Sequence, residues 1–250
     1  MGRPGSANGP VGGPKPVKYI HKGGRPRAYA EWCDKVVGTD QEDYRDLPGV
    51  TKQALLKALI QEQGALCAYT MRRIEEGSSH VEHIKPQSLC RTECRGADLD
   101  YGNLVACFPR EDMMKLFRWG AQRKGNWWGE GAFVSPLHPA CERRFHFDLD
   151  GNIATAGNDA AARTTVQVLG LDHPGLTEER GRVIQEYLFG PNGDDPMSRA
   201  QATRAEEVVC NRDGRGIFIE YCVAIRYALR QHLALLDRRA RKKKALRRRS

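Results

Sequence analysis

Apolar positions at helical spacing predict most of this chain's regular structure. Leu55, Leu56, Leu59 and Ile60 form one stripe ahead of Gly64, which predicts a helix over residues 51–63. A helix is also predicted within residues 111–123, and three more near 158–169, 177–189 and 198–210. Thr177 is the capping residue expected to begin the second of these three. A last helix is predicted over 217–237, where seven apolar side chains share one face.

Alternating positions predict a few short strands among these helices. Residues 79–84 form one, ended by Pro86, and residues 103–108 form a second. Residues 144–154 predict a hairpin, because Asp150-Gly151 separates two alternating runs. Short strands in a mainly helical chain indicate the α+β class.

Composition and hydropathy are those of a soluble globular protein. The chain has 250 residues, 40% hydrophobic and 28% charged, which is room for one good-sized domain or two small ones. No apolar run reaches 18 residues, so no membrane-spanning helix is expected. Residues 1–16 are rich in Gly and Pro, are predicted to be disordered and carry no export signal, so a cytoplasmic location is expected. The eight cysteines are accordingly expected to be reduced thiols.

The net charge of +9 is concentrated at the two ends of the sequence. Residues 1–30 hold six Lys or Arg and residues 238–250 hold nine, and neither segment contains an acid. Residues 31–237 therefore carry about −6. Basic runs of this kind suit phosphate contact, although a solvated tail is the alternative for residues 238–250.

Three side chains in the middle of the chain match the needs of phosphodiester hydrolysis. His83 is an imidazole that can deprotonate water near neutral pH, and Glu82 is a carboxylate that can hold a hard divalent cation. Asn103 is an amide that can fix the intervening loop. On a regular strand Glu82 and His83 face opposite sides, so the chain is expected to leave the strand near His83, as Pro86 favours.

The segment containing these residues resembles HNH, or ββα-metal, endonucleases. The matching tract is His80-x-Glu82-His83-Ile84-x-Pro86, with Asn103-Leu104 downstream. The flanking segments resemble the PtuB-like HNH proteins of Septu and retron anti-phage systems: Gln63-Gly64-x-Leu66-Cys67-Ala68-Tyr69, Gly120-Ala121-x-x-Lys124, residues 133–137 and Cys141-Glu142-x-x-Phe145. The resemblance spans roughly residues 17–187 and implies a small ββα-metal core within the α+β chain.

The resemblance implies a role for each matching residue. His83 is the expected general base, Glu82 the metal ligand beside it, and Asn103 the residue that holds the loop. Lys124 is expected at phosphate, with a solvated surface position as the alternative. His80 is either a second ligand or orients Glu82. The expected ion is Mg²⁺, with Mn²⁺ possible.

The sequence departs from the HNH pattern at two places. Cys67 is followed three residues later by Thr70 rather than by a second Cys, which argues against a four-thiolate zinc knuckle unless Cys90, Cys94 or Cys141 substitutes. The metal ligand usually supplied by the site helix is also not evident. Asp112 is the candidate by spacing, ahead of Gln122.

These observations predict a metal-dependent endonuclease acting on nucleic acid, with DNA the expected substrate. The resemblance also implies a role in anti-phage defence with a PtuA-like ATPase partner. Two alternatives remain: a non-catalytic nucleic-acid-binding module, or an RNA or tRNA nuclease. The predicted organisation is a disordered segment 1–16, a nuclease domain 17–155 that begins with helices, a helical region 156–237 and a basic tail 238–250.

Overall fold

The computed structural model describes residues 18–247 and confirms a mixture of helices with two small antiparallel sheets. Residues 1–16 and the basic residues Arg248 and Arg249, on which predictions were made, lie outside the described residues. The helices are α1 (Arg27–Val36), α2 (Gly49–Glu62), α3 (Gln87–Glu93), α4 (Ala121–Lys124), α5 (Ala160–Leu169), α6 (Pro174–Phe189), α7 (Arg199–Val208) and α8 (Cys222–Arg247); the strands are β1 (His80–His83), β2 (Leu104–Cys107), β3 (Phe145–Phe147) and β4 (Ile153–Thr155).

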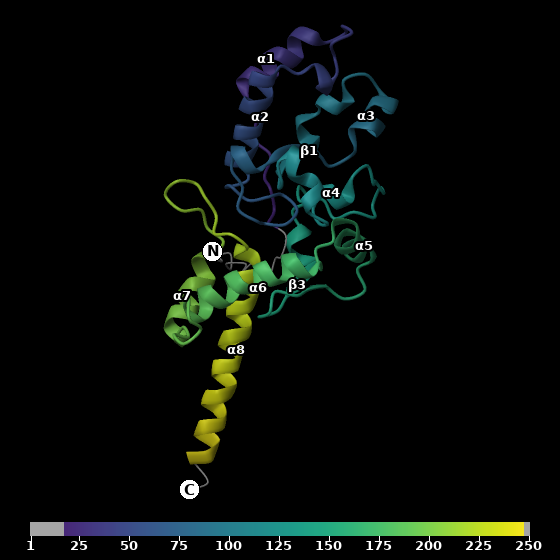
Figure 1. The fold of residues 1–250 in the computed structure, drawn as a ribbon. Coiled ribbons are helices and arrows are strands. Elements are labelled where there is room, and N and C mark those ends of the chain that lie inside the picture. The colour runs from purple at the N-terminus through teal and green to yellow at the C-terminus, as the bar shows by residue number, and fades with distance from the viewer. Residues whose placement is uncertain (1–17, 248–250) are drawn as a thin grey trace, which may run out of the picture.

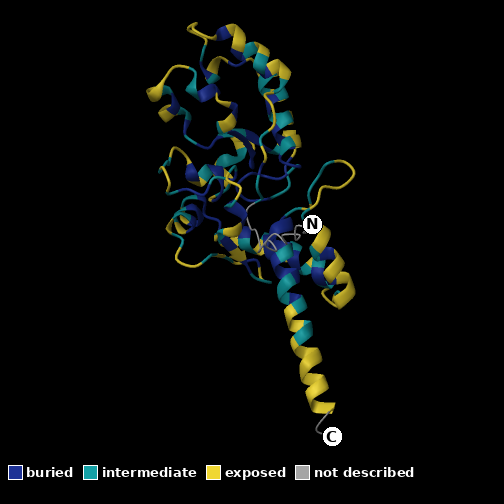
Figure 2. Ribbon diagram, turned by 180° about the vertical axis from the view of Figure 1, so that it is seen from behind, coloured by how far each residue is buried: buried dark blue, intermediate teal, exposed yellow. Residues whose placement is uncertain are grey.

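The described chain forms an elongated body from which α8 projects (Figure 1). α1, α2 and the β1–β2 sheet make up one end of the body, and α6 and α7 lie beside the root of α8 at the other. The buried apolar residues nevertheless form one connected core that runs from Ile20 to Leu229. Figure 2 shows this core in dark blue, continuing into the upper part of α8.

The strands predicted within residues 79–84 and 103–108 and the hairpin over residues 144–154 are present. β1 pairs antiparallel with β2, with Glu82 opposite Val105 and His83 opposite Leu104. β3 pairs with β4 across the Asp150-Gly151 turn. Gly151 has φ +84°, and a Cβ there would come within 2.5 Å of the Gly181 nitrogen in α6, so both the turn and its packing require glycine.

Several predicted helix boundaries are wrong. Within residues 111–123, where a helix was predicted, the chain forms a 3₁₀ helix, Glu111–Leu116, and most of α4, and Gly120, with φ +74°, separates the two. α6 begins at Pro174 rather than at Thr177, because proline is favoured in the first helical turn and the His173 side chain accepts from the Gly175 N–H at 3.2 Å.

The last helix also differs from its predicted range of 217–237. α8 begins at Cys222, after Tyr221 at φ +51°, and continues to Arg247. The apolar stripe ends before the basic residues begin, so the pattern alone could not extend the helix through them. The sequence predicted no separate residue ranges for α1 and α3.

No helix within residues 18–247 combines the length and apolar character needed to cross a bilayer.

Candidate active site

The β1–β2 sheet and the loop between its strands carry the predicted catalytic residues. β1 ends at His83, and Pro86 immediately precedes α3, so the chain leaves the strand where the sequence indicated. Strand alternation directs Glu82 toward His80 and Lys124, and His83 toward Tyr44 and Asp98. The two side chains therefore begin on opposite faces of one strand end.

His83 is held in a defined orientation by backbone and by an aromatic ring. Its Nε2 lies 2.9 Å from the Asp98 carbonyl oxygen, which only accepts, so Nε2 carries the proton in the neutral ring. The Tyr44 ring meets the imidazole edge-on with centroids 4.7 Å apart. Burial lowers the pKa of His83, which keeps the ring neutral at physiological pH. Nδ1 consequently bears the lone pair, the form that a general base requires.

Asn103 closes the loop between β1 and β2. Its Oδ1 accepts from the Lys85 N–H at 2.8 Å, and its Nδ2 donates to the Lys85 carbonyl at 2.9 Å. Lys85 is therefore fixed relative to β2, because the Asn103 amide binds both its backbone N–H and its backbone carbonyl. The Asn103 carbonyl also accepts from the Ile84 N–H at 3.0 Å, which extends the pairing beyond His83.

Glu82 lies between a lysine and a histidine. The Lys124 ammonium donates to Glu82 Oε1 at 2.8 Å and to the His83 carbonyl at 3.1 Å, and this lysine side chain is only 1% exposed. On the other side, His80 Nε2 is 3.8 Å from Glu82 Oε2. The solvated surface position, which was the alternative for Lys124, is wrong because the side chain is buried. Its phosphate contact stays a prediction, since in this structure the ammonium is directed at Glu82.

The His80 ring turns its Nε2 toward Glu82. Its Nδ1 is 2.5 Å from the Pro109 carbonyl and is therefore the donor, which leaves Nε2 buried and without a hydrogen-bond partner in the described chain. Burial alone lowers the pKa of His80, but Glu82 and the Pro109 carbonyl outweigh it and raise the pKa. The raised pKa favours the protonated ring, whose Nε2–H faces Glu82. In the neutral ring the same nitrogen and the carboxylate oxygen are two donor atoms that fit a divalent cation.

Asp112 is not brought to this pair. It lies on the 3₁₀ helix Glu111–Leu116, where Arg110 donates to both carboxylate oxygens at 2.6 and 2.8 Å. Within residues 18–247 no three His, Cys, Asp or Glu side chains gather closely enough to hold a metal ion. His80 and Glu82 thus form a two-residue donor set, and the third ligand stays a prediction.

Two cysteines of the expected knuckle region are adjacent behind the sheet. Cys67 Sγ accepts from the Phe108 N–H at 3.3 Å. Burial raises the pKa of the Cys67 thiol, but hydrogen bonds with the Cys107 thiol and Thr70 lower it by more. The pKa of Cys67 therefore falls to about 6. Cys90 and Cys141 bond elsewhere, to the carbonyls of Lys85 and Pro136. The described thiols therefore do not assemble into a four-ligand zinc site.

A cavity of about 310 Å³ adjoins the site between α2, β1 and the 3₁₀ helix that carries Asp112. Its lining includes Tyr44, Lys52, Ser79, His80, Arg110 and Asp112. Lysine and arginine at such a cavity are suited to a phosphate group.

Sequence reasoning missed two residues around His83. Tyr44 comes from a 3₁₀ turn, Tyr44–Asp46, and its backbone N–H donates to the buried Asp98 carboxylate at 3.1 Å. Asp98 in turn supplies the carbonyl that orients His83. No motif marks either residue, because each acts through the backbone or a ring edge set by tertiary packing.

Comparison with known proteins gives one informative relative and no matching family model. Over 150 residues the chain is 31% identical to a protein of Vibrio cholerae serotype O1 biovar El Tor named "Retron Vc95 putative HNH endonuclease". The aligned part is 58% of this chain and 69% of that protein.

Proposed function

The chain belongs to the HNH endonuclease family, and from this premise we propose that it is a metal-dependent endonuclease that cleaves DNA with His83 as general base. The observation that carries the proposal is the tautomer of His83. Donation from Nε2 to the Asp98 carbonyl leaves Nδ1 as acceptor, and no described group hydrogen bonds to it. A water bound at Nδ1 would lose its proton to His83 as its oxygen attacks phosphorus.

The residues around His83 support this role in different ways. The Asp98 carbonyl keeps accepting from Nε2–H once the ring is protonated, and so stabilises the imidazolium. Asn103 holds the loop that carries Asp98, and the charge of Glu82 also favours protonated His83. We assign His80 and Glu82 to hold a divalent ion, with Mg²⁺ favoured and Mn²⁺ possible. Such an ion supplies positive charge to the phosphate and the departing oxygen.

The test is cleavage of supercoiled plasmid by the purified full chain with Mg²⁺ or Mn²⁺, and with EDTA. We expect metal-dependent cutting that falls by about 10²–10⁴-fold in His83→Ala, the contribution typical of a general base. His146→Ala is the matched control, because His146 is exposed on β3 and away from the sheet that holds the site. Equal loss in both variants, or full activity in His83→Ala, would contradict the assignment.

A folded wild-type protein that binds DNA but never cuts it would instead support the non-catalytic alternative. The incomplete ligand set favours that alternative. Parallel incubation with RNA tests the third candidate, an RNA nuclease, because general-base hydrolysis does not depend on a 2′-hydroxyl.

The relative's name sets it in a retron. We extend this to the present chain and propose that it is the nuclease effector of an anti-phage system, working with an ATPase partner. Affinity purification of the tagged chain, expressed with its neighbouring genes, tests the partnership. Recovery of no ATPase would argue against it.

A further inference from the structure

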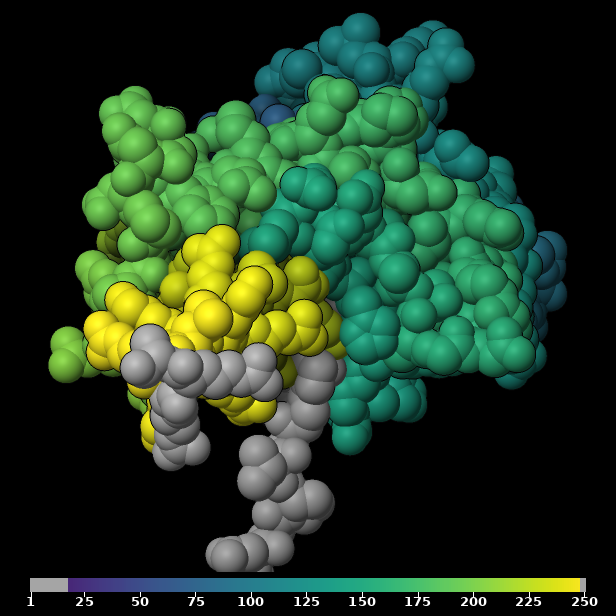
Figure 3. All heavy atoms as spheres, turned by 90° about the horizontal axis from the view of Figure 1, so that it is seen from below, coloured from purple at the N-terminus to yellow at the C-terminus, as the bar shows by residue number. Residues whose placement is uncertain are grey.

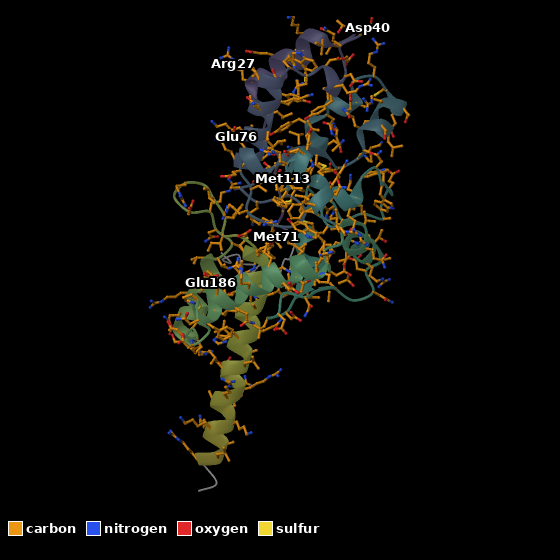
Figure 4. The ribbon with its side chains drawn as sticks, in the orientation of Figure 1. Arg27, Asp40, Met71, Glu76, Met113 and Glu186 are labelled. Carbon is orange, nitrogen blue, oxygen red and sulfur yellow. The ribbon has the colours of Figure 1, made fainter. Side chains whose placement is uncertain are left out.

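The final part of α8 stands clear of the molecule. All ten residues from 238 to 247, the basic arm, are exposed, and Figure 2 shows this part of α8 in yellow below a buried root. Arg199 of α7 makes a bidentate pair with Asp237, at 2.9 and 3.4 Å, where the arm begins. Beyond this pair, the side chains of α8 project into open space (Figure 4).

The arm is almost entirely cationic. Its basic residues are Arg238, Arg239, Arg241, Lys242, Lys243, Lys244 and Arg247, and it contains no acid. Within residues 18–247, none of these seven side chains has an ion-pair partner. Like charges three and four residues apart oppose helix formation, and a helix that is polar on every side needs support from outside. An anionic partner would supply that support.

The distribution of charge around the arm indicates what shape an anionic partner must have. At 100° per residue, the seven basic residues are spaced around the whole helix, so that Arg239 and Lys243, for example, lie opposite Arg241 and Arg238. A flat acidic surface would engage one side of the helix and leave the charges of the opposite side in water. A groove with phosphates along both edges engages charges on two opposite sides. The arm also lacks the broad apolar face of a membrane-surface helix, since its other residues are Ala240, Ala245 and Leu246.

We propose that the basic arm binds duplex DNA by lying in the major groove between the two phosphate backbones. The inference deepens the proposed function by assigning a surface to its substrate. An α-helix with side chains is about 10–12 Å across, and the major groove of B-DNA is about 12 Å wide. The major groove of an RNA duplex is too narrow and deep for this. The arm points away from the end of the body that holds β1 (Figure 1), so it anchors DNA rather than completing the catalytic site.

The space-filling view from the end toward which α8 points places the yellow α8 beside the green α6–α7 region (Figure 3). Arg230 of α8 is paired with Glu206 of α7 there, at 2.6 Å. The root of α8 is thus fixed to the body, and the arm presents its charges at a defined position.

The test measures DNA binding separately from cutting. Full-length protein in EDTA is titrated against a fluorescent 30-base-pair duplex DNA and the matching duplex RNA at several salt concentrations. The arm variant neutralises charges on opposite sides of the helix: Arg238→Gln, Arg239→Gln, Arg241→Gln and Lys243→Gln. The control variant removes the same charge from exposed sites on the body: Lys35→Gln, Lys57→Gln, Arg163→Gln and Arg182→Gln.

We expect the arm variant to bind DNA at least about tenfold more weakly at 0.1 M salt and to lower the salt slope by about 2–4, while the control changes much less. Amide hydrogen exchange in the arm should slow when DNA is bound. Equal effects of the two variants, no effect of the arm variant, or equally tight binding of duplex RNA would overturn the inference. Arm-dependent binding without any cutting would contradict the proposed function alone, and cutting with no arm effect would contradict this inference alone.

Discussion

The buried ammonium of Lys124 is the residue-scale feature that most affects Glu82. It neutralises one carboxylate oxygen and leaves the other facing His80 Nε2. A lysine so deeply buried contributes to the stability of the fold mainly by compensating the charge of Glu82. Loss of Lys124 leaves the half-buried Glu82 carboxylate without a cation. Removal of both charges together leaves no unpaired charge.

A double-mutant cycle tests this compensation. We expect Lys124→Met to lower the free energy of unfolding by about 3 kcal/mol, because breaking a buried pair strands its partner. In the background of Glu82→Gln the same substitution should cost less, with a coupling energy of about 0.5–3 kcal/mol. Urea unfolding of the four proteins measures it, and strictly additive effects would show that the pair does not interact.

The parts of the site that were predictable from sequence are the local ones. Glu82, His83 and Asn103 are positioned by a strand end and one loop closure, both visible in the residue pattern. Tyr44 and Asp98 were not predictable, because their contacts with His83 join segments far apart in the chain. Lys124 was recognised as a basic position, but whether it faced phosphate or a carboxylate depended on packing.

At the scale of elements, one carboxylate holds the N-terminus of α5 in place. Asp159 accepts from the Ala162 N–H at 2.9 Å as the helix N-cap and from Arg144, next to β3, at 2.6 Å on each oxygen. The Arg144 guanidinium lowers the pKa of Asp159. The cap therefore also ties α5 to the β3–β4 hairpin.

The lowered pKa of Asp159 sets a pH dependence. The stabilising contribution is fully present above the unfolded pKa of about 3.9 and is lost as pH falls through the lower pKa of the folded state. Asp159→Asn keeps a good N-cap and removes the charge, so we expect a loss of about 1 kcal/mol at pH 7. Urea unfolding from pH 7 to pH 3 should show the difference from wild type shrinking below about pH 4, whereas Asp194→Asn, on an exposed loop, should differ little throughout.

Helices and strands differ in how well their limits could be predicted. Those flanked by glycine or proline, such as α2, had clear limits in the sequence. α8 did not, because its last turns have no apolar stripe and a basic run is equally typical of an unstructured tail. Its helical continuation follows from propagation of an already packed helix, a cooperative effect that composition does not reveal.

Across the whole molecule, buried Glu142 joins three distant parts of the chain. It accepts from the Tyr19 N–H at 2.8 Å, lies 3.6 Å from the Lys18 ammonium and 3.5 Å from Arg226 of α8, and its side chain is 4% exposed. The predicted segments 17–155 and 156–237 are therefore linked by a buried charge cluster as well as by the core.

This linkage predicts that the two segments unfold together. Calorimetry of the full chain should show a single transition, and Glu142→Gln should lower its Tm by about 5–10 °C, since two partly buried cations lose their counter-charge. Glu186→Gln is the control, because its pair with Arg182 on α6 is exposed and should contribute less than about 1 kcal/mol. Two separate transitions in the wild type would show that the segments are independent.

The same cluster has a consequence for how the protein is made. Residue 19 is bound by a side chain 123 positions later, and Arg226 follows later still. At about 5–20 residues per second, the ribosome needs roughly 6–25 s to add the residues between Tyr19 and Glu142. During that interval the Tyr19 N–H lacks its native acceptor. The Glu142 cluster of a newly synthesised chain therefore cannot be completed until Arg226 has left the exit tunnel.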